Sequence, residues 1–417
     1  MKIVSPKVAV SKIEDGTHVI FPGSCANPTR FYDAFSSDVG RFKDLTVCSG
    51  LSLGNYSFLE NGLGTNFHYK TWQAAPQLRK LFKENDKAKV SFIPSRLSDV
   101  DKLVCKGGLI QPDVAVIQTS TPQNDGSVSL GISVGPNQNF INQAKIVIAE
   151  MNNNMPVTCG DSRVSIDDID YAIESDSPLV VYDTGTPTNN DAKIVDFVLS
   201  LIPENATVQF GVGAIPDRVL AGLASISGAK LFSGMLTQSL IYFLENVRND
   251  IVAVNGELAG NQELYDYCHL NERLFMAPLS KTHNFFELSA LERFVSINSA
   301  VEIDLQGQSN GETLGPVQIS GVGGSLDYIQ AALLCDGGVS ILAMPSTTAG
   351  DKKSKIVAHL AHGSAVTTPR YCVDYVVTEY GIAALRGRTL WDRAEQLIEV
   401  AHPKFKDALI VDFEKQV

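Results

Sequence analysis

The chain has 417 residues, of which 44% are hydrophobic and 19% are charged, and its formal net charge is −12 at pH 7. This composition is typical of a folded globular protein and excludes a largely disordered one. The acidic balance argues against a nucleic-acid-binding protein, which needs a basic surface, but it permits an anionic small ligand at a local site.

The seven cysteines are scattered along the chain, odd in number and without a Cys-x-x-Cys pair. Such a pattern favours a reduced, cytoplasmic protein with packed thiols. The N-terminal residues lack the apolar run of a signal peptide. No segment reaches the roughly 18 uninterrupted apolar residues of a membrane-spanning helix, so we expect no membrane association.

Short runs of β-branched and apolar residues recur along the chain, separated by helix-length stretches. They predict strands at residues 18–21, 90–93, 114–117, 145–150, 207–210, 295–297, 338–343 and 375–377. Amphipathic stretches at 193–201 and 239–245 predict helices between them. The alternation indicates an α/β fold with mostly parallel sheets. The polar, turn-rich segment 175–190 predicts a junction between two domains of similar size, residues 1–187 and 188–417.

A first glycine turn, Gly211-Val212-Gly213, follows the predicted strand at 207–210. Pro216 suits the first turn of a helix that continues through residues 218–223. Backbone amides at such a helix start can hold an anion or a developing oxyanion. A purely structural turn is the more common role of this pattern, which also lacks the third glycine of a dinucleotide-binding fingerprint.

A second glycine turn contains Gly321, Gly323 and Gly324 and leads into an apolar helix predicted at 329–334. Glycines let a ligand approach the backbone closely. The alternative interpretation is a tight turn whose following helix is capped by Ser325 or Asp327.

A third turn, at Tyr380-Gly381, ends the strand at 375–377 and precedes a short apolar segment, 382–385, that has a helix-like pattern. Arg386 follows this segment. Its guanidinium group could bind a phosphate, although pairing with a carboxylate is more common.

The string from Val373 to Gly387 resembles a hallmark of the acetyl-CoA hydrolase/transferase family, the class I coenzyme A transferases that include 4-hydroxybutyrate and succinyl-CoA:acetate CoA-transferases. The resemblance covers nearly the whole chain, with matching segments in the same order and spacing. These segments are residues 118–131, 149–160, 211–216, 297–308 and 321–328.

The resemblance implies two similar α/β domains with an acyl-CoA between them. It implies CoA transfer between small acyl-CoA thioesters (acetate, butyrate or 4-hydroxybutyrate type) and a carboxylate acceptor. In the family a glutamate attacks the thioester, and an acyl-glutamyl anhydride and then a glutamyl-CoA thioester follow. The oxyanion amides carry over to Val212 and Gly324. The residues expected to line the bound substrate are Gly211, Gly213, Gly321, Gly323, Cys25 and Arg386.

The resemblance also implies a homo-oligomer, a dimer or tetramer. Its partners would be small molecules, an acyl-CoA and a carboxylate. We expect no metal and no permanently bound cofactor, because coenzyme A enters as part of the substrate.

One family residue is missing. Where the family has Thr-Glu, with the glutamate as nucleophile, this chain has Ser233-Gly234. No acidic residue occurs between Asp217 and Glu245, so a small shift of the alignment supplies none.

Four interpretations remain open. The protein can be an acyl-CoA hydrolase, or another acyl-CoA enzyme, that activates water with a different group, and Gly234 would leave space for that water molecule. It can remain a transferase with a carboxylate from elsewhere, such as Glu257 or Glu60, although a solvated surface position is the more common role of both. The acceptor carboxylate can attack directly in a ternary complex. Finally, the chain can be a non-catalytic protein that binds CoA esters.

Two other side chains, Ser233 and Cys25, are candidates for the expected site, and each also has an ordinary structural role. Ser233 adjoins the vacant position but needs a base to act as a nucleophile. Cys25 lies in a loop that borders the acyl pocket in the family. A thiol between a strand and a helix can have a lowered pKa, although buried packing is more common.

Two histidines, His359 and His362, are three residues apart and could share a helix face, but no third metal ligand is evident. Three carboxylates are predicted to position turns rather than react: Glu302, Asp304 and Glu379.

Overall fold

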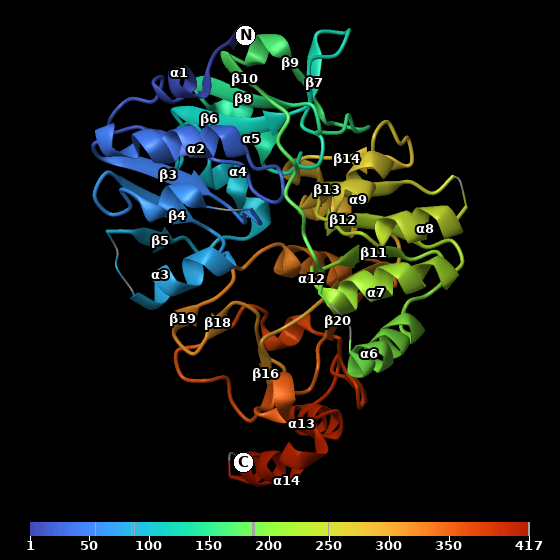
Figure 1. The fold of residues 1–417 in the computed structure, drawn as a ribbon. Helices are drawn as coiled ribbons and strands as arrows, with labels where there is room; N and C mark the ends of the chain where they lie inside the picture. The colour runs from blue at the N-terminus through green and yellow to red at the C-terminus, as the bar shows by residue number, and fades with distance from the viewer. Residues whose placement is uncertain (55, 85, 87, 186–187, 249, 416–417) are drawn as a thin grey trace. The chain divides into compact units, whose positions relative to one another are not determined.

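The computed structural model describes residues 1–417 except 55, 85, 87, 186–187, 249 and 416–417 (Figure 1). The chain forms two compact units. Unit 1 contains Met1–Asp183, Gly234–Gln238 and Val252–Thr282, and unit 2 contains Thr184–Ser233, Ser239–Ile251 and His283–Val417. The domain boundary predicted between residues 187 and 188 falls at 186–187, outside the described residues, and stays a prediction.

Unit 1 is built on an eight-stranded parallel sheet with the strand order β1-β10-β8-β6-β2-β3-β4-β5. These strands are β1 (Lys2–Ile3), β2 (His18–Ile20), β3 (Leu45–Ser49), β4 (Phe67–Thr71), β5 (Val90–Phe92), β6 (Val114–Thr119), β8 (Ile146–Asn152) and β10 (Tyr171–Ser175). An antiparallel pair, β7 (Ser127–Ser129) and β9 (Arg163–Ser165), projects from it. The helices of this part are α1 (Pro6–Val10), α2 (Thr29–Asp38), α3 (Arg79–Glu84), α4 (Val100–Leu103) and α5 (Asn137–Gln143). Short 3-10 helices occupy Val39–Arg41, Ser57–Glu60, Pro76–Leu78, Leu97–Asp99 and Ile166–Asp168.

The second sheet has the order β14-β13-β12-β11-β15-β20-β22-β23. Its strands are β11 (Thr207–Phe210), β12 (Lys230–Leu236), β13 (Ala253–Leu258), β14 (Leu274–Met276), β15 (Phe294–Asn298), β20 (Val339–Ala343), β22 (Tyr375–Thr378) and β23 (Gly381–Ala384). β11 pairs in parallel with β12 and β15, and β22 pairs antiparallel with β23. The last residues of β12, with β13 and β14, belong to unit 1.

Helices and small sheets complete the chain. In unit 1 the additional helices are α9 (Gln262–Tyr267) and α10 (Leu279–Thr282). In unit 2 they are α6 (Asn189–Ser200), α7 (Ala214–Gly222), α8 (Leu240–Asn246), α11 (Phe285–Ser289), α12 (Ser325–Leu334), α13 (Leu390–Glu399) and α14 (Pro403–Glu414), with 3-10 turns at Leu223–Ser225, Ala349–Asp351 and Arg370–Cys372. The small sheets are formed by β16 (Glu302–Asp304), β17 (Ser309–Asn310) and β21 (Ile356–Val357), and by β18 (Thr313–Leu314) and β19 (Val317–Gln318).

The predicted α/β fold with mostly parallel sheets is confirmed, and each predicted strand run overlaps an observed strand. One local prediction was wrong. The apolar segment 382–385, which has a helix-like pattern, lies largely in β23. Gly381 has φ +144°, which lets the chain reverse at once, so the next residues pair with β22 instead of starting a helix.

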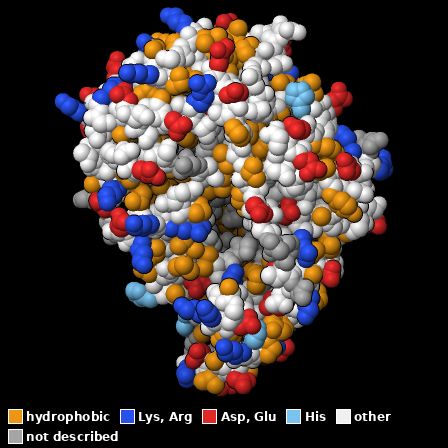
Figure 2. Space-filling view, in the orientation of Figure 1, with side chains coloured by type: hydrophobic (Ala, Val, Ile, Leu, Met, Phe, Trp, Pro, Cys, Tyr) orange, Lys and Arg blue, Asp and Glu red, His pale blue; other side chains and the backbone are white. Residues whose placement is uncertain are grey.

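On the face drawn in Figure 2, lysine and arginine side chains are interspersed with acidic ones. Mixed charge of this kind presents no continuous basic stripe on that face. Among the described residues, none of the helices is both long and apolar enough to cross a bilayer.

An aromatic cluster forms the centre of the core of unit 1. The ring of Phe21, which follows β2, contacts four other rings at centroid distances of 4.9–5.9 Å. These partners, all buried, are Phe31, Tyr32, Phe35 and Phe58. Because α2 supplies three of them, the cluster attaches that helix to the sheet.

We predict that Phe21→Ala lowers the free energy of unfolding by about 3–5 kcal/mol, since it removes a fully buried ring and leaves a cavity. Urea unfolding of the whole chain measures this change. Phe286→Ala is the matched control, because Phe286 is 81% exposed. Equal effects of the two substitutions would contradict the central role of the cluster.

Candidate active site

Strands β12 and β13 place the vacant position beside Gly256, the residue that precedes Glu257. The N–H of Ala259 donates to the carbonyl of Leu236 at 3.0 Å, which places Gly234 across from Gly256. A Cβ atom on Gly256 would lie 3.0 Å from the carbonyl oxygen of Gly234. Glu257 is the next residue of β13. Because side chains alternate along a strand, the side chain of Glu257 leaves the sheet on the face opposite to that of residues 234 and 256.

The backbone around Glu257 is held by the segment before α5. The N–H groups of Val134 and Gly135 both donate to the carbonyl of Gly256, each at 3.1 Å. The N–H of Leu258 donates to the carbonyl of Ile132 at 2.8 Å. Because these bonds lie on both sides of Glu257, they fix the direction in which its side chain leaves the strand.

Gly135 provides the space that the carboxyl group occupies. A Cβ atom at this position would collide with Oε1 of Glu257. Any side chain other than hydrogen at residue 135 would therefore displace the carboxyl group.

The surroundings of Glu257 disfavour its charged form. Burial raises the pKa of Glu257 to about 8, while the neighbouring Ser133 and Ser24 hydroxyls act in the opposite direction. Its Oε2 is enclosed and accepts no hydrogen bond within the part of the chain that the structure describes. At neutral pH the group is therefore mostly protonated, and it becomes a carboxylate as the pH rises past about 8.

Cys25 lies in the same neighbourhood. Its side chain is buried, and burial raises the pKa of the thiol to about 11, with Glu257 adding to the shift. The suggested lowering of the pKa was wrong, because desolvation outweighs any favourable turn geometry. Packing, the more common role, is what the structure shows for Cys25. Its predicted contact with substrate stays a prediction.

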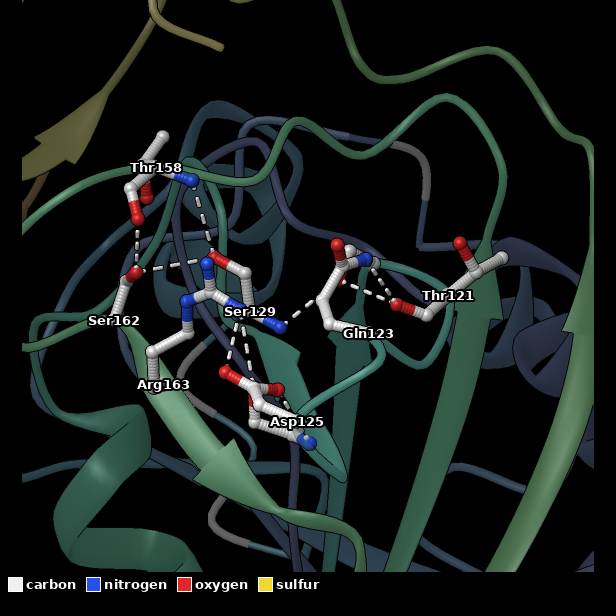
Figure 3. Close-up of polar contacts among 9 residues, drawn as sticks. Thr121, Gln123, Asp125, Ser129, Thr158, Ser162 and Arg163 are labelled. Atoms are coloured by element: carbon white, nitrogen blue, oxygen red, sulfur yellow. Dashed lines mark hydrogen bonds and ion pairs between the residues drawn. The ribbon is translucent and has the colours of Figure 1, made fainter. Parts of the chain in front are cut away.

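Hydroxyl groups hold the loop that leads to this region (Figure 3). Ser129 Oγ accepts hydrogen bonds from the N–H groups of Gly131 and Thr158, at 3.1 and 3.2 Å, and donates to Ser162 Oγ. The Thr158 hydroxyl donates to the carbonyl of Gly131 at 2.9 Å. These bonds fix the chain just before residues 132–135, and so they support the cradle of Glu257 indirectly.

The first glycine turn, in unit 2, has the geometry expected of an anion-binding helix start. Gly213 has φ +134° and precedes α7, and the N–H of Gly211 donates to the carbonyl of Ile297 at 2.8 Å. Val212 is 42% exposed, and its amide donates no hydrogen bond among the described residues. This amide is accordingly available to an external acceptor.

The second glycine turn, also in unit 2, lies against a buried histidine. Gly323 has φ +68°, and Gly324 caps α12, which begins earlier than the predicted 329–334. A Cβ atom on Gly324 would collide with Nε2 of His283. Burial lowers the pKa of His283 to about 3, so its imidazole is neutral. Gly321 lies at the start of the same turn.

Ser233 and Arg386 both have protein partners. The buried Ser233 hydroxyl donates to the carbonyl of Phe210 at 3.2 Å. Arg386 forms an ion pair with Asp374, a carboxylate that also accepts the N–H of Ser340. Arg386 is thus paired with a carboxylate, the more common role given for it above. The substrate roles of Ser233 and Arg386 stay predictions.

The carboxylates predicted to be architectural do organise turns. Asp304 accepts the N–H groups of Gln306 and Gln308, at 3.0 and 2.9 Å. Glu379 accepts both the N–H and the hydroxyl of Ser346.

The predicted shared helix face of His359 and His362 was wrong. Residues 356–357 form β21, and the chain is not helical through 363. Among the described residues, no group of three or more His, Cys, Asp or Glu side chains is arranged to hold a metal ion.

Comparison with known proteins assigns the family. The model of the acetyl-CoA hydrolase/transferase N-terminal domain matches residues 1–182, and that of the C-terminal domain matches residues 260–413. The chain is similar to the 4-hydroxybutyrate coenzyme A transferase of Clostridium kluyveri, with 34% identity across 100% of this chain and 98% of that protein. The chain belongs to the acetyl-CoA hydrolase/transferase family. Members of this family are CoA-transferases or acetyl-CoA hydrolases.

Two solved structures have the same fold along the whole chain. RipA from Yersinia pestis superposes with a TM-score of 0.93 at 26% identity, covering 100% of this chain and 97% of that one. The 4-hydroxybutyrate CoA-transferase of Porphyromonas gingivalis has a TM-score of 0.82 at 29% identity, covering 100% and 98%.

The sequence analysis did not predict the buried surroundings of Glu257. A solvated surface position was the expected role of Glu257 and Glu60; it is right for Glu60, which is exposed, and wrong for Glu257, whose Oε2 is enclosed. Ser24, Ser133 and Gly135 were not singled out. Their residue types are common, and their approach to Glu257 spans more than a hundred residues of sequence.

We predict that Glu257→Gln stabilises the protein at high pH. The folded-state pKa of about 8 exceeds the reference value of 4.5, so the stability of the wild type falls as pH rises between these values and levels off above the upper one. Glutamine does not titrate, so the variant escapes this loss.

Urea unfolding at pH 5 and pH 9 measures the effect. The variant should gain roughly 2–4 kcal/mol relative to wild type between these two pH values. Glu263→Gln, at an exposed glutamate on α9, is the control and should show no such gain. A pH-independent difference for Glu257→Gln would contradict the raised pKa.

Proposed function

We propose that the chain is an acyl-CoA:carboxylate CoA-transferase that acts on small acyl-CoA thioesters of the acetate, butyrate or 4-hydroxybutyrate type. The observation that carries this proposal is the 34% identity to the Clostridium kluyveri 4-hydroxybutyrate coenzyme A transferase along the entire chain. A butyryl-CoA:acetate CoA-transferase of Anaerostipes caccae is 29% identical over 99% of the chain and supports the same reaction class.

The glycine turns of unit 2 suit the proposed chemistry. CoA transfer passes through tetrahedral intermediates whose oxyanions need preorganised N–H donors. We assign the amides of Val212 and Gly324 to this role. Gly211, Gly213, Gly321 and Gly323 keep the adjoining backbone open to a ligand. Val212 is 42% exposed, and its amide donates no hydrogen bond among the described residues, which favours the assignment.

Hydrolysis of acyl-CoA is the second candidate. The absence of a carboxylate at Gly234 favours it, and the chain is 26% identical to an acetyl-CoA hydrolase of Kluyveromyces lactis over 71% of its length. A non-catalytic protein that binds CoA esters is the third. In each case coenzyme A enters as substrate or ligand. We propose a cytoplasmic location, which the seven free cysteines support, and a homo-oligomer, which rests on the family resemblance alone.

The first test is isotope exchange. Purified protein is incubated with a panel of acyl-CoA thioesters and labelled acetate, and free thiol is measured in parallel. We expect labelled acetyl-CoA without net thiol release. Thiol release that does not depend on acetate would indicate a hydrolase. Absence of both signals would favour a binding protein or a substrate outside the panel; either result rejects the proposed transfer of these acyl groups.

We predict that Gly324→Val lowers the turnover of this exchange by roughly 100-fold or more, because losing one oxyanion donor costs that much in other enzymes. The new side chain would collide with His283 and move the turn. Gly40→Ala is the control, since a Cβ atom there has nothing within 4 Å. Unchanged turnover of the Gly324 variant would remove Gly324 from the proposed site.

A further inference from the structure

We propose that Glu312 is a positioning residue for the second glycine turn. Its buried carboxyl group fixes the backbone that enters residues 321–324, and with it the amide of Gly324. The inference rests on the proposed transfer function, in which that amide holds the oxyanion. Glu312 acts through the turn and not on the substrate, and the residues that connect the two all belong to unit 2.

The main chain of Glu312 holds the segment that leads into the turn. The N–H groups of Ile319 and Ser320 both donate to the carbonyl of Glu312, at 2.9 and 3.1 Å. Strands β18 and β19 pair antiparallel between these two points. The hairpin therefore returns the chain to Glu312 immediately before Gly321.

The side chain of Glu312 binds the same segment a second time. Glu312 is only 5% exposed, and its Oε2 accepts a hydrogen bond from the side-chain amide of Gln318 at 3.0 Å. That amide also donates to the carbonyl of Ser320 at 2.7 Å. Because Ser320 directly precedes Gly321, Gln318 links the buried carboxyl group to the entrance of the turn.

The other carboxyl oxygen is anchored to a distant segment of unit 2. Oε1 of Glu312 accepts the hydroxyl of Thr367 at 2.9 Å, and the same hydroxyl accepts the N–H of Gly311 at 2.9 Å. Two backbone bonds of 3.0 Å join Ser309 to Thr368, the residue after Thr367. The carboxyl group is thus held from one side by a paired segment and binds the entrance of the turn from the other.

The glycine turn needs support of this kind from outside. It has three glycines in four residues, and glycine restricts the backbone least of all residue types. An oxyanion donor is effective only when its direction is fixed before the reaction starts. The link through Gln318 supplies a constraint at the entrance of the turn, and the start of α12 supplies one at its exit.

Glu312→Gln tests the inference. A glutamine side chain has one acceptor oxygen, so it can keep the bond to Gln318 or the bond to Thr367, while its NH2 group faces the other donor. We expect kcat of the acyl-CoA:acetate isotope exchange to fall by roughly 10-fold or more, while KM for acyl-CoA changes by less than about 2-fold, because the lost interaction acts in the transition state. Steady-state kinetics measure both constants.

Glu302→Gln is the matched control. Oε1 of Glu302 accepts both of its hydrogen bonds, from the Asn310 amide at 3.0 Å and from the Ser364 hydroxyl at 2.9 Å. A single amide oxygen can accept the same two bonds, so this variant should keep the wild-type kcat and KM. An equal fall of kcat in both variants would mean a general loss of structure and would overturn the role of Glu312.

Hydrogen exchange followed by mass spectrometry gives a readout that does not depend on activity. The N–H groups of residues 319–324 should exchange roughly 10-fold faster in Glu312→Gln than in wild type or Glu302→Gln, since their local constraint is weakened. Lower kcat without faster hydrogen exchange, or the reverse, would overturn the inference and leave the proposed function standing. Wild-type protein that shows no isotope exchange would reject the proposed function and the positioning role together.

Gln318→Met is a second variant that keeps the test decisive if Glu312→Gln does not fold. It removes the link to Ser320 at a half-buried position and leaves the buried carboxyl group in place. We expect the same fall in kcat at an unchanged KM, and the same faster hydrogen exchange. Wild-type kcat in Gln318→Met would overturn the inference, because the constraint would then not pass from Glu312 to the turn.

Discussion

The arrangement around Glu257 depends on one set of backbone contacts, the pairing of the end of β13 with the segment that precedes α5. The carbonyl of Gly256 accepts two N–H groups there, and the N–H of Leu258 is bound to Ile132. Without these bonds the glutamate would point towards solvent, as glutamates near strand ends commonly do. With them, its carboxyl group is held against the backbone of Gly135. The serine and threonine network around Ser129 fixes the same segment from the other side.

A carboxyl group in such a place is expensive for the fold. Desolvation dominates its pKa, and two serine hydroxyls only partly offset the effect. Elsewhere the chain handles buried carboxylates differently. Asp374 is paired with Arg386 and with the backbone of β20, and Asp304 binds successive N–H groups of its own turn. Asp374 and Asp304 differ in this respect from Glu257, whereas Glu150 and Asp101 also have one buried carboxyl oxygen without a hydrogen-bond partner among the described residues. The ion pair with Asp374 also explains why Arg386 is a weak candidate for phosphate binding, since its charge already serves a buried partner.

Glycine has two different roles at three positions of the candidate site. At Gly213, a positive φ allows the chain to turn from β11 into α7, and the amide of the neighbouring Val212 has no hydrogen bond among the described residues. At Gly324, the absence of a side chain accommodates His283. At Gly135, it accommodates a carboxyl group. The same residue type thus supplies a backbone conformation in one place and space in the other two.

Much of the fold followed from the sequence alone, because local patterns carry it. Apolar runs such as 114–117 and 207–210 predict parallel strands, and the glycine turns predict where helices begin. Motif order identified the family and predicts that Gly234 stands in place of its glutamate. The helix-like pattern at 382–385 was misleading, because the turn at Gly381 and pairing with β22 place these residues largely in a strand. The setting of Glu257 could not be predicted, because residues 24, 133 and 135 reach it only through long-range pairing. Desolvation is likewise a property of the assembled surroundings, so only the tertiary structure distinguishes the exposed Glu60 from the enclosed carboxyl group of Glu257.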